Sequence, residues 1–168
     1  MKEIRREREF ILVPVLEKGR VVKVKKQDLF KKYDVDCIIK LPRGDFSHLK
    51  KVKSFLTHFN LQKTNHSKGY KYALALIIKP GFFDGKKQVL PVLSFENVVV
   101  AECLSVRNNV SYDKLIPKDF EYSFEHIRNV PELKKAILRR YSRSMPHLSK
   151  EEILSLGVGI TKLRILRK

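Results

Sequence analysis

Two short stretches near the start of the chain are rich in apolar residues, and the second of them alternates Val with Lys. Residues 9–16 (EFILVPVL) and 20–25 (RVVKVK) are separated by a polar segment in which Gly19 suits a tight turn. Successive side chains of a strand point to opposite faces, so Lys23 and Lys25 share one face. The pattern predicts a β-hairpin that exposes a basic face to solvent.

Helical spacing of apolar residues follows in the next part of the chain. Asp45 suits the N-cap of a helix that we expect to continue to about Asn60. His48 and His58 would lie on this helix as partly exposed residues. The apolar stripe that would bury one face of the helix comprises Leu49, Val52, Leu56 and Phe59.

Two more helices are predicted in the last third of the chain. The first spans about 130–142, with Asn129 as its N-cap. The second is shorter. It begins at a capping box formed by Ser149 and Glu152 and stops at Gly157.

The remaining apolar runs have the length and the boundaries of strands. Pro, Gly and Asn residues delimit them, and they span residues 35–41, 70–78, 88–95, 98–106 and 158–166. The second and third runs would be joined by the turn KPGFFDGKK. We expect Phe82 and Phe83 of this turn to fold back into the core.

The chain has the length of one domain. Its 168 residues, 43% of them hydrophobic, are enough to bury a sizeable core, and neither an internal repeat nor a linker interrupts them. The expected elements combine into a single α+β domain over residues 1–168. It would hold a mostly antiparallel sheet, with about three helices covering one of its sides.

Charge narrows the range of partners. The chain carries 36 Lys and Arg residues against 18 Asp and Glu residues, a formal net charge of +18 at pH 7. A field of that sign attracts polyanions such as RNA, DNA or an anionic lipid surface. A surface that served solubility alone would mix the two signs more evenly. The composition therefore indicates a polyanionic partner.

Cysteine content and hydropathy indicate the compartment. Cys37 and Cys103 are the only cysteines, which excludes a four-cysteine zinc site or a disulfide framework. The first ten residues, MKEIRREREF, lack the apolar core of a signal peptide. The longest apolar run is far shorter than the roughly 20 residues that span a bilayer. We expect an intracellular protein, soluble or peripherally bound to a membrane.

Patterns of catalytic or metal-binding residues are missing from the sequence. The five histidines form neither an i, i+4 pair nor a cluster with Cys or Asp. The segment GVG at 157–159 is too short for a phosphate-binding loop. Glu96 and Glu102 have the even separation that places two residues on one side of a strand, but a nuclease site needs a third acidic group. We expect no enzymatic activity, no metal and no cofactor.

One segment resembles a motif of RNA-binding proteins. KGYKY at 68–72 resembles the RNP1 strand of RNA-recognition motifs, where aromatic side chains stack on bases, and CIIKLP at 37–42 resembles the companion RNP2 strand. The resemblance would place Tyr70 and Tyr72 on an RNA-binding sheet. Lys71, however, stands where the motif has a small residue, and the second segment lacks its aromatic residue. We interpret the segment as a buried strand with two tyrosines at its edge.

A second segment resembles part of a nuclease motif. GFFDG at 81–85 is similar to the end of the helix that defines LAGLIDADG homing endonucleases, which would imply metal-dependent cleavage. The metal-binding acid of that family lies two residues after the aspartate matched by Asp84. Lys86 occupies this position, and a lysine cannot coordinate Mg²⁺. Pro80 would also interrupt the helix. We interpret the segment as a turn between strands.

Basic residues concentrate towards the C-terminal end of the sequence. On the helix expected at 130–142, Leu133, Ile137 and Tyr141 are spaced to face the core, which turns basic residues outward. Guanidinium groups match phosphate oxygens and also stack on bases. The candidate nucleic-acid-binding residues are Lys135, Arg139, Arg140 and Arg143, with Lys162 and Arg164 of the last strand and Lys68 and Tyr70 of the aromatic segment.

Three functions remain open at this point. The leading hypothesis is a non-catalytic protein that binds nucleic acid, RNA ahead of DNA, or a ribonucleoprotein through a basic surface. The alternative is a matrix-like protein that binds acidic membrane surfaces and bridges them to a ribonucleoprotein, an analogy of size and charge with small basic matrix proteins of RNA viruses. A metal-dependent nuclease ranks third. An exposed apolar loop or amphipathic helix would favour the membrane, whereas tyrosines on a basic groove would favour RNA.

Overall fold

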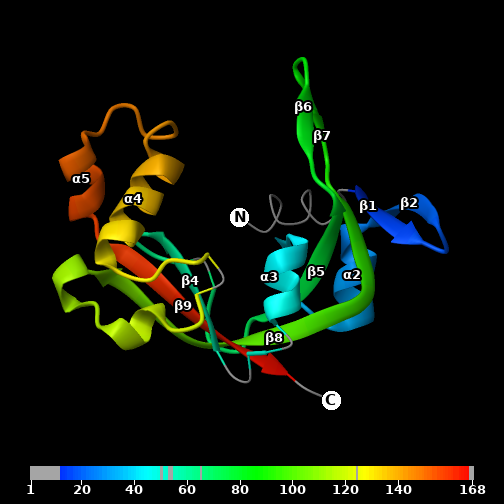
Figure 1. Ribbon diagram of the computed structural model, residues 1–168, viewed down its shortest axis with the longest axis horizontal. Coiled ribbons are helices and arrows are strands. Elements are labelled where there is room, and N and C mark those ends of the chain that lie inside the picture. The colour runs from blue at the N-terminus through cyan, green and yellow to red at the C-terminus, as the bar shows by residue number, and fades with distance from the viewer. Residues whose placement is uncertain (1–11, 50, 53–54, 65, 124, 167–168) are drawn as a thin grey trace. The chain divides into compact units, whose positions relative to one another are not determined.

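The computed structural model describes residues 12–49, 51–52, 55–64, 66–123 and 125–166 (Figure 1). Helices and strands are mixed along the chain, and most strand pairs are antiparallel, which confirms the predicted α+β class. The structure divides into two compact units. The first comprises the described parts of Met1–Lys51, Lys71–Ala101 and Leu166–Lys168, and the second those of Val52–Tyr70 and Glu102–Ile165. A single domain over the whole chain stays a prediction.

The first unit begins with the predicted hairpin. Strands β1 (Leu12–Glu17) and β2 (Arg20–Lys25) pair antiparallel, from Leu12 opposite Lys25 to Glu17 opposite Arg20. The two turn residues, Lys18 and Gly19, have φ angles of 50° and 77°. Two consecutive positive φ angles are what a type I′ turn requires, and this turn matches the twist of the strands that it joins. The lysines of β2 are exposed, as the alternation predicted.

Three strands extend the sheet of the first unit beyond β1. Strand β8 (Val92–Val110) pairs in parallel with β1 at Val15 and Leu93. Strand β5 (Lys71–Lys79) lies beside β8, and β3 (Cys37–Leu41) runs parallel to β5, giving the order β2-β1-β8-β5-β3. The parallel pairs bring together strands that are distant in the sequence. Strand β8 continues past this sheet into the second unit.

Two helices lie in the described part of the first unit. Helix α2 (Lys26–Tyr33) buries Leu29 against the sheet, and the short helix α3 (Arg43–His48) buries Phe46. Tyr72 on β5 is only 1% exposed and therefore lies in the core, so the expected buried strand is confirmed. The core beneath α2 contains Val13, Val15, Leu29, Val35, Ala73, Ala75, Leu93 and Phe95.

A separate hairpin takes the place of the turn expected between the strands predicted at 70–78 and 88–95. Strands β6 (Phe82–Asp84) and β7 (Lys87–Val89) pair antiparallel and extend away from the rest of the first unit (Figure 1). Phe82 and Phe83 are 58% and 74% exposed. The expectation that they enter the core is wrong, because both stand on a hairpin that leaves the sheet.

The second unit is built on three strands and two α-helices. Strand β4 (Phe55–Leu61) pairs antiparallel with β9 (Val158–Leu166), and β9 also pairs with β8. Helices α4 (Val130–Tyr141) and α5 (Lys150–Ser155) are those predicted from their caps. The short 3₁₀ helices η1 (Tyr112–Lys114) and η2 (Pro117–Phe120) precede them. The core of this unit contains Phe59, Leu61, Tyr112, Phe120, Ile127, Leu133, Ile137, Ile153, Val158 and Ile160.

The helix expected from Asp45 to Asn60 is wrong beyond His48, and its expected N-cap is wrong as well. Helix α3 follows Pro42 as its N-cap, has Asp45 in its first turn and ends at His48, and the residues from Phe55 onwards form β4. Leu56, Thr57 and Phe59 are all buried, so β4 is covered on both faces. A strand of this kind reproduces apolar spacings of three residues that also suit a helix. As a result His48 and His58 lie on different elements.

The strand expected at 88–95 is divided, because 88–89 belong to β7, and its remainder forms one strand, β8, with the strand expected at 98–106. β8 runs through 19 residues, and the exposed pair Glu96 and Asn97 lies within it rather than in a turn. The first part of the strand has partners in the first unit's sheet, and the later part pairs with β9. Polar residues therefore mark an exposed stretch of this strand and not its end.

Two glycines join α5 to β9 where backbones approach closely. Gly157 has a φ of 77°, and a Cβ atom there would lie 2.8 Å from the carbonyl oxygen of Val110. A Cβ atom on Gly159 would lie 2.7 Å from the carbonyl carbon of Lys63. Distances this short leave no room for a side chain. The positive φ of Gly157 ends the helix there, as predicted, and the missing side chains let the start of β9 pack directly against two neighbouring segments.

The burial of Tyr72 leads to a first prediction. Tyr72→Ala should lower the free energy of unfolding by about 3–5 kcal/mol, because it removes a large side chain from a packed core. Urea denaturation followed by circular dichroism measures this loss. Tyr70→Ala is the comparison, since Tyr70 is only partly buried, and it should cost less. A Tyr72→Ala protein with parental stability and weakened RNA binding would place Tyr72 on a binding surface instead.

Candidate nucleic-acid interface

Helix α4 positions most of the candidate binding residues. The Asn129 side chain caps the helix by accepting a hydrogen bond of 3.0 Å from the Glu132 N–H. Leu133 and Ile137 are completely buried, as predicted, and they fix the rotation of the helix about its axis. Lys135 therefore projects from the opposite, exposed face.

Three exposed cations lie four residues apart on this side of α4. The chain continues in a helical turn after Tyr141, since the N–H of Met145 donates to the Tyr141 carbonyl over 3.0 Å. Arg143 thus follows Lys135 and Arg139 at helical spacing. We call Lys135, Arg139 and Arg143 the α4 basic face. All three are exposed, and no carboxylate in the described part of the chain forms an ion pair with them.

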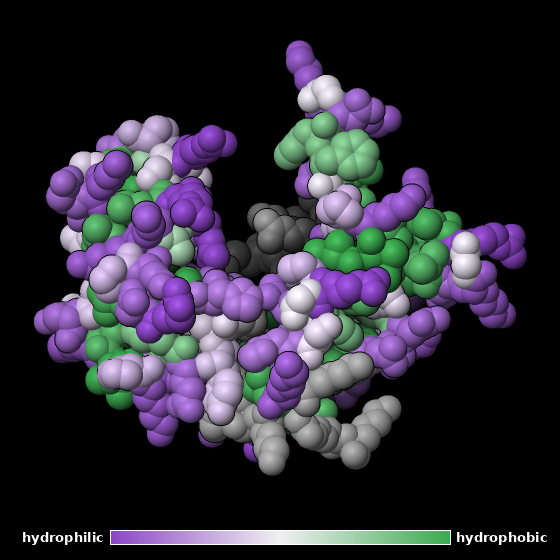
Figure 2. Space-filling view, in the orientation of Figure 1, coloured by the Kyte–Doolittle hydropathy of each residue, from purple (hydrophilic) through white to green (hydrophobic). Residues whose placement is uncertain are grey.

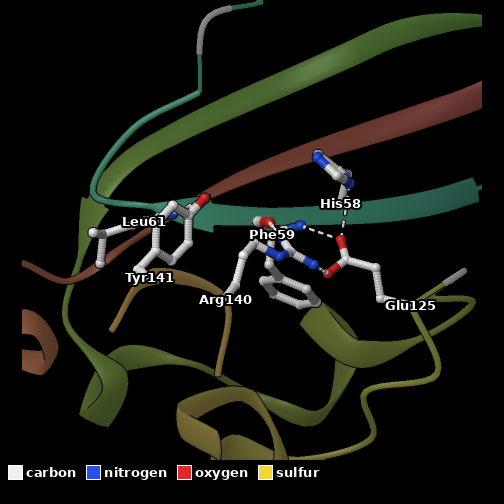
Figure 3. Close-up of polar contacts among 6 residues, drawn as sticks. All are labelled: His58, Phe59, Leu61, Glu125, Arg140 and Tyr141. Carbon is white, nitrogen blue, oxygen red and sulfur yellow. Dashed lines mark hydrogen bonds and ion pairs between the residues drawn. The ribbon is translucent and has the colours of Figure 1, made fainter. Parts of the chain in front are cut away.

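Arg140, also a candidate, faces a buried carboxylate instead. One Nη of Arg140 lies 3.0 Å from Oε2 of Glu125, and the other donates a 3.1 Å hydrogen bond to the carbonyl oxygen of Phe59. Nδ1 of His58 lies 2.8 Å from Oε1 of Glu125. Figure 3 shows the carboxylate of Glu125 between His58 and Arg140. Only 11% of the Glu125 side chain is exposed.

The same side chains supply hydrogen-bond partners for backbone groups of β4 at its outer edge, the edge that does not pair with β9. The Phe59 N–H donates to Oε1 of Glu125 over 2.8 Å, and the Leu61 N–H donates to the Tyr141 hydroxyl over 3.4 Å (Figure 3). Phe59 lies opposite Ile160 of β9, but its N–H and carbonyl are directed to Glu125 and Arg140. Buried backbone groups need such partners. Arg140 and Tyr141 therefore fasten the end of α4 to the edge of the sheet.

The pKa values of the central pair follow from this geometry. Burial alone would raise the pKa of Glu125, but the hydrogen bond and electrostatic interaction with His58, the Phe59 N–H and the charge of Arg140 lower it below its ordinary value. Burial alone would lower the pKa of Arg140, but the charge and hydrogen bond of Glu125 raise it. Each charge thus stabilises the other.

A second buried carboxylate, that of Asp119, lies close to Lys162, which is also a candidate binding residue. Asp119 is 1% exposed and accepts a 2.7 Å hydrogen bond from Nη1 of Arg107. Nζ of Lys162 lies 3.8 Å from the same oxygen, and the Ile116 N–H donates to the other oxygen over 3.0 Å. Two cations therefore neutralise one carboxylate. Lys162 accordingly has a structural role in addition to any contact with a ligand.

The other candidates lie on separate elements of the same unit. Nη2 of Arg164 on β9 is 3.8 Å from Oε1 of Glu102 on β8. Lys68 is exposed in the turn before β5. Tyr70 follows it and stacks on His66, with ring centroids 4.4 Å apart and an angle of 10° between the planes. The structure thus groups Lys135, Arg139 and Arg143 and assigns the remaining candidates to other surroundings.

Sequence patterns did not reveal the two buried carboxylates. Glu125 lies in an irregular segment, 15 residues before Arg140, and Asp119 lies in the short helix η2, 12 residues after Arg107. Neither the period of a helix nor that of a strand indicates contact between residues that are this far apart in the sequence. The one available indication was chemical, because Asp and Glu are seldom fully buried unless they are paired.

Within the described ranges, no group of three or more His, Cys, Asp or Glu residues is placed to hold a metal ion. Among these residues, too, no helix combines the length and the apolar character needed to cross a bilayer. Glu96 is exposed on β8, and Glu102 faces Arg164.

Comparisons of the chain with protein-family models, with curated protein sequences and with solved structures find no match. The functional argument therefore depends on the geometry alone.

The Glu125 contacts generate a second prediction. Glu125→Gln should lower the free energy of unfolding at pH 7 by about 2 kcal/mol, because Arg140 loses its buried partner. A carboxyl whose pKa is lowered by folding stabilises the protein above its unfolded pKa of about 4.3, and this stabilisation disappears as the pH falls through the folded pKa. The difference between parent and variant should therefore narrow below about pH 4.

Chemical denaturation across this pH range provides the measurement. Glu121→Gln is the matched control, because Glu121 is a neighbouring but exposed glutamate. A constant difference between parent and Glu125→Gln at all pH values would contradict the role assigned to the Glu125 charge.

Proposed function

We propose that the protein is a non-catalytic nucleic-acid-binding protein that binds RNA ahead of DNA through the α4 basic face. The observation that carries this proposal is that Lys135, Arg139 and Arg143 are exposed at helical spacing and unpaired by carboxylates in the described part of the chain. Other cations of the same unit face Glu125, Asp119 or Glu102. The α4 basic face is thus a row of cations on one helix that remains available to an external anion.

The chemistry of the three residues suits a phosphate backbone. Residues four apart on a helix lie about 5–6 Å from one another at their Cβ atoms, so the three charges form a row. A guanidinium group can contact two phosphate oxygens at once, whereas Lys135 offers a point charge. Guanidinium planes also stack on unpaired bases, which RNA presents in single strands and loops. This supports RNA ahead of DNA.

Rigidity of the helix supports the same proposal. The buried Leu133 and Ile137 hold one side of α4, and Arg140 and Tyr141 fasten its end to β4. A row of charges on a fixed helix loses less conformational freedom on binding than charges on a loose loop. The core and the Glu125 contacts therefore prepare the surface that the proposal assigns to the ligand.

An acidic membrane surface is the second candidate partner. The same charge would attract anionic lipids, and the exposed Phe82 and Phe83 meet the criterion of an exposed apolar segment. Vesicles of phosphatidylserine and phosphatidylcholine therefore accompany RNA in the binding measurements below.

The third prediction tests the α4 basic face. Replacing Lys135, Arg139 and Arg143 together by glutamine should weaken binding to a single-stranded oligoribonucleotide. It should also reduce the slope of log affinity against log salt by about 2, because each phosphate that the protein neutralises adds about 0.7 to that slope. The melting temperature should change by no more than about 2 °C, because all three side chains are exposed. Fluorescence anisotropy at several salt concentrations measures the affinity and its slope.

A matched variant removes the same charge elsewhere. Lys23, Lys25 and Lys31 are exposed on β2 and α2, and their replacement by glutamine should change the slope less than the α4 variant does. If the control variant loses the slope and the α4 variant keeps it, the contact surface is the basic ribbon of the first hairpin. RNA binding that does not depend on salt would reject the electrostatic proposal as a whole.

The fourth prediction concerns catalysis. Incubation of single-stranded RNA or DNA with the protein and Mg²⁺ or Mn²⁺ should leave the nucleic acid intact, since a metal-dependent nuclease holds its ions with clustered carboxylates. Gel electrophoresis of the products provides the measurement. Metal-dependent cleavage that a Glu96→Gln or Glu102→Gln substitution abolishes would identify an enzyme.

A further inference from the structure

The β6–β7 hairpin carries two large aromatic side chains that do not enter a core. Phe82 and Phe83 are 58% and 74% exposed, the highest exposures among the large apolar residues that the structure describes. Adjacent residues of a strand point to opposite faces, so each ring stands on its own face of the two-stranded ribbon. In Figure 2 the middle of the hairpin is pale green and its tip is purple.

The hairpin is built to hold its shape. Phe82 pairs with Val89, Phe83 with Gln88 and Asp84 with Lys87. Gly85 has a φ of 63°, which suits the first central position of a type II′ turn. At the base, a Cβ atom on Gly81 would lie 2.9 Å from Cδ of Pro91, so two chain segments meet there without room for a side chain. The rings are therefore displayed on a defined ribbon.

Positive charge surrounds the rings. Lys79 precedes the hairpin, and Lys86 and Lys87 lie at its tip, all exposed. Asp84 is the one acidic residue between Lys79 and Pro91. An exposed aromatic pair with lysines on both sides matches a polyanion that also offers apolar surface. Single-stranded nucleic acid has this character, with phosphates outside and flat bases for stacking.

The order of residues along the hairpin distinguishes nucleic acid from a membrane. An insertion of the tip into a bilayer would carry Asp84, Lys86 and Lys87 deeper than the rings, and charged side chains are costly at depth. A hairpin lying flat on a membrane would bury one ring and leave the other in water. A single strand of RNA meets neither obstacle, since bases can stack on both faces of the ribbon while phosphates contact the lysines.

We propose that the β6–β7 hairpin is a stacking arm, on which Phe82 and Phe83 hold unpaired bases of the nucleic acid while Lys79, Lys86 and Lys87 contact its phosphates. The inference rests on the proposed function but concerns a different unit of the chain and a different kind of contact. The α4 basic face supplies charge. The rings of the arm supply a contribution that does not depend on salt.

Affinity for a single-stranded oligoribonucleotide tests the arm. Phe82→Ala with Phe83→Ala should weaken binding at least about fivefold, the lower end of the effect of losing one stacked base, and should leave the salt slope unchanged. Phe82→Leu with Phe83→Leu keeps apolar surface but removes the rings, and it should bind as weakly as the alanine variant. Val21→Ala, at a comparably exposed apolar residue of β2, is the control and should bind like the parent.

A fluorescent reporter identifies the occupant directly. The chain contains no tryptophan, so Phe83→Trp introduces a single reporter on the arm. Its emission should be quenched by the oligoribonucleotide and unchanged by vesicles of phosphatidylserine and phosphatidylcholine. A blue shift with vesicles and no response to RNA would overturn the proposal in favour of a membrane.

The two proposals fail in different ways. If the α4 variant loses its salt slope while both arm variants bind like the parent, the stacking arm is rejected and the proposed function stands. If the leucine variant binds like the parent, apolar surface rather than stacking is responsible, and the arm as proposed is also rejected. If the parent protein does not bind RNA at low salt, both proposals are rejected.

Discussion

The outer edge of β4 is the constraint on which the second unit depends. The strand is buried on both faces and pairs with β9 along one side, so the backbone groups of its other side need partners that water cannot supply. Glu125, Arg140 and Tyr141 provide them. Because two of these three residues lie at the end of α4, the same contacts decide where that helix lies and which of its side chains face solvent. The exposure of the α4 basic face therefore follows from the hydrogen bonds that join the end of α4 to the outer edge of β4.

The count of 36 Lys and Arg residues overstates the number of cations that a ligand can meet. Arg140 faces Glu125, Arg107 and Lys162 face Asp119, and Arg164 faces Glu102. The positive residues in these pairs are held by carboxylates of the same unit and have a structural role. Residues such as Arg139 and Arg143 differ in kind, because their removal alters the external field and little else. A basic protein of this type is better described by its unpaired cations than by its total charge.

Local patterns predicted the features that depend on neighbouring residues. Asn129 and the Ser149–Glu152 box indicated two helix starts, since a cap acts within one turn, and the alternation at β2 with the turn at Gly19 indicated the first hairpin. Strand β4 was predicted as a helix, because a strand that is buried on both faces carries apolar residues at spacings that also suit a helix. The exposure of Phe82 and Phe83 was not predicted, because a hydrophobic residue is buried only where a second layer of structure covers its strand. The pairing of Arg140 with Glu125 joins segments that no short-range pattern connects, so part of the candidate site could not be resolved from the sequence.

The two glycines that join α5 to β9 have a consequence for evolutionary comparison. Gly157 and Gly159 are held in place by the backbones of Val110 and Lys63, and any larger residue would force those segments apart. Substitution should therefore be rare at both positions in any relative that keeps this fold, whatever ligand the relative binds. An alignment of such relatives would display an invariant G-x-G beside a helix, a pattern easily taken for a nucleotide-binding loop. Here the same spacing records the close packing of three backbone segments, and its invariance would carry information about architecture rather than chemistry.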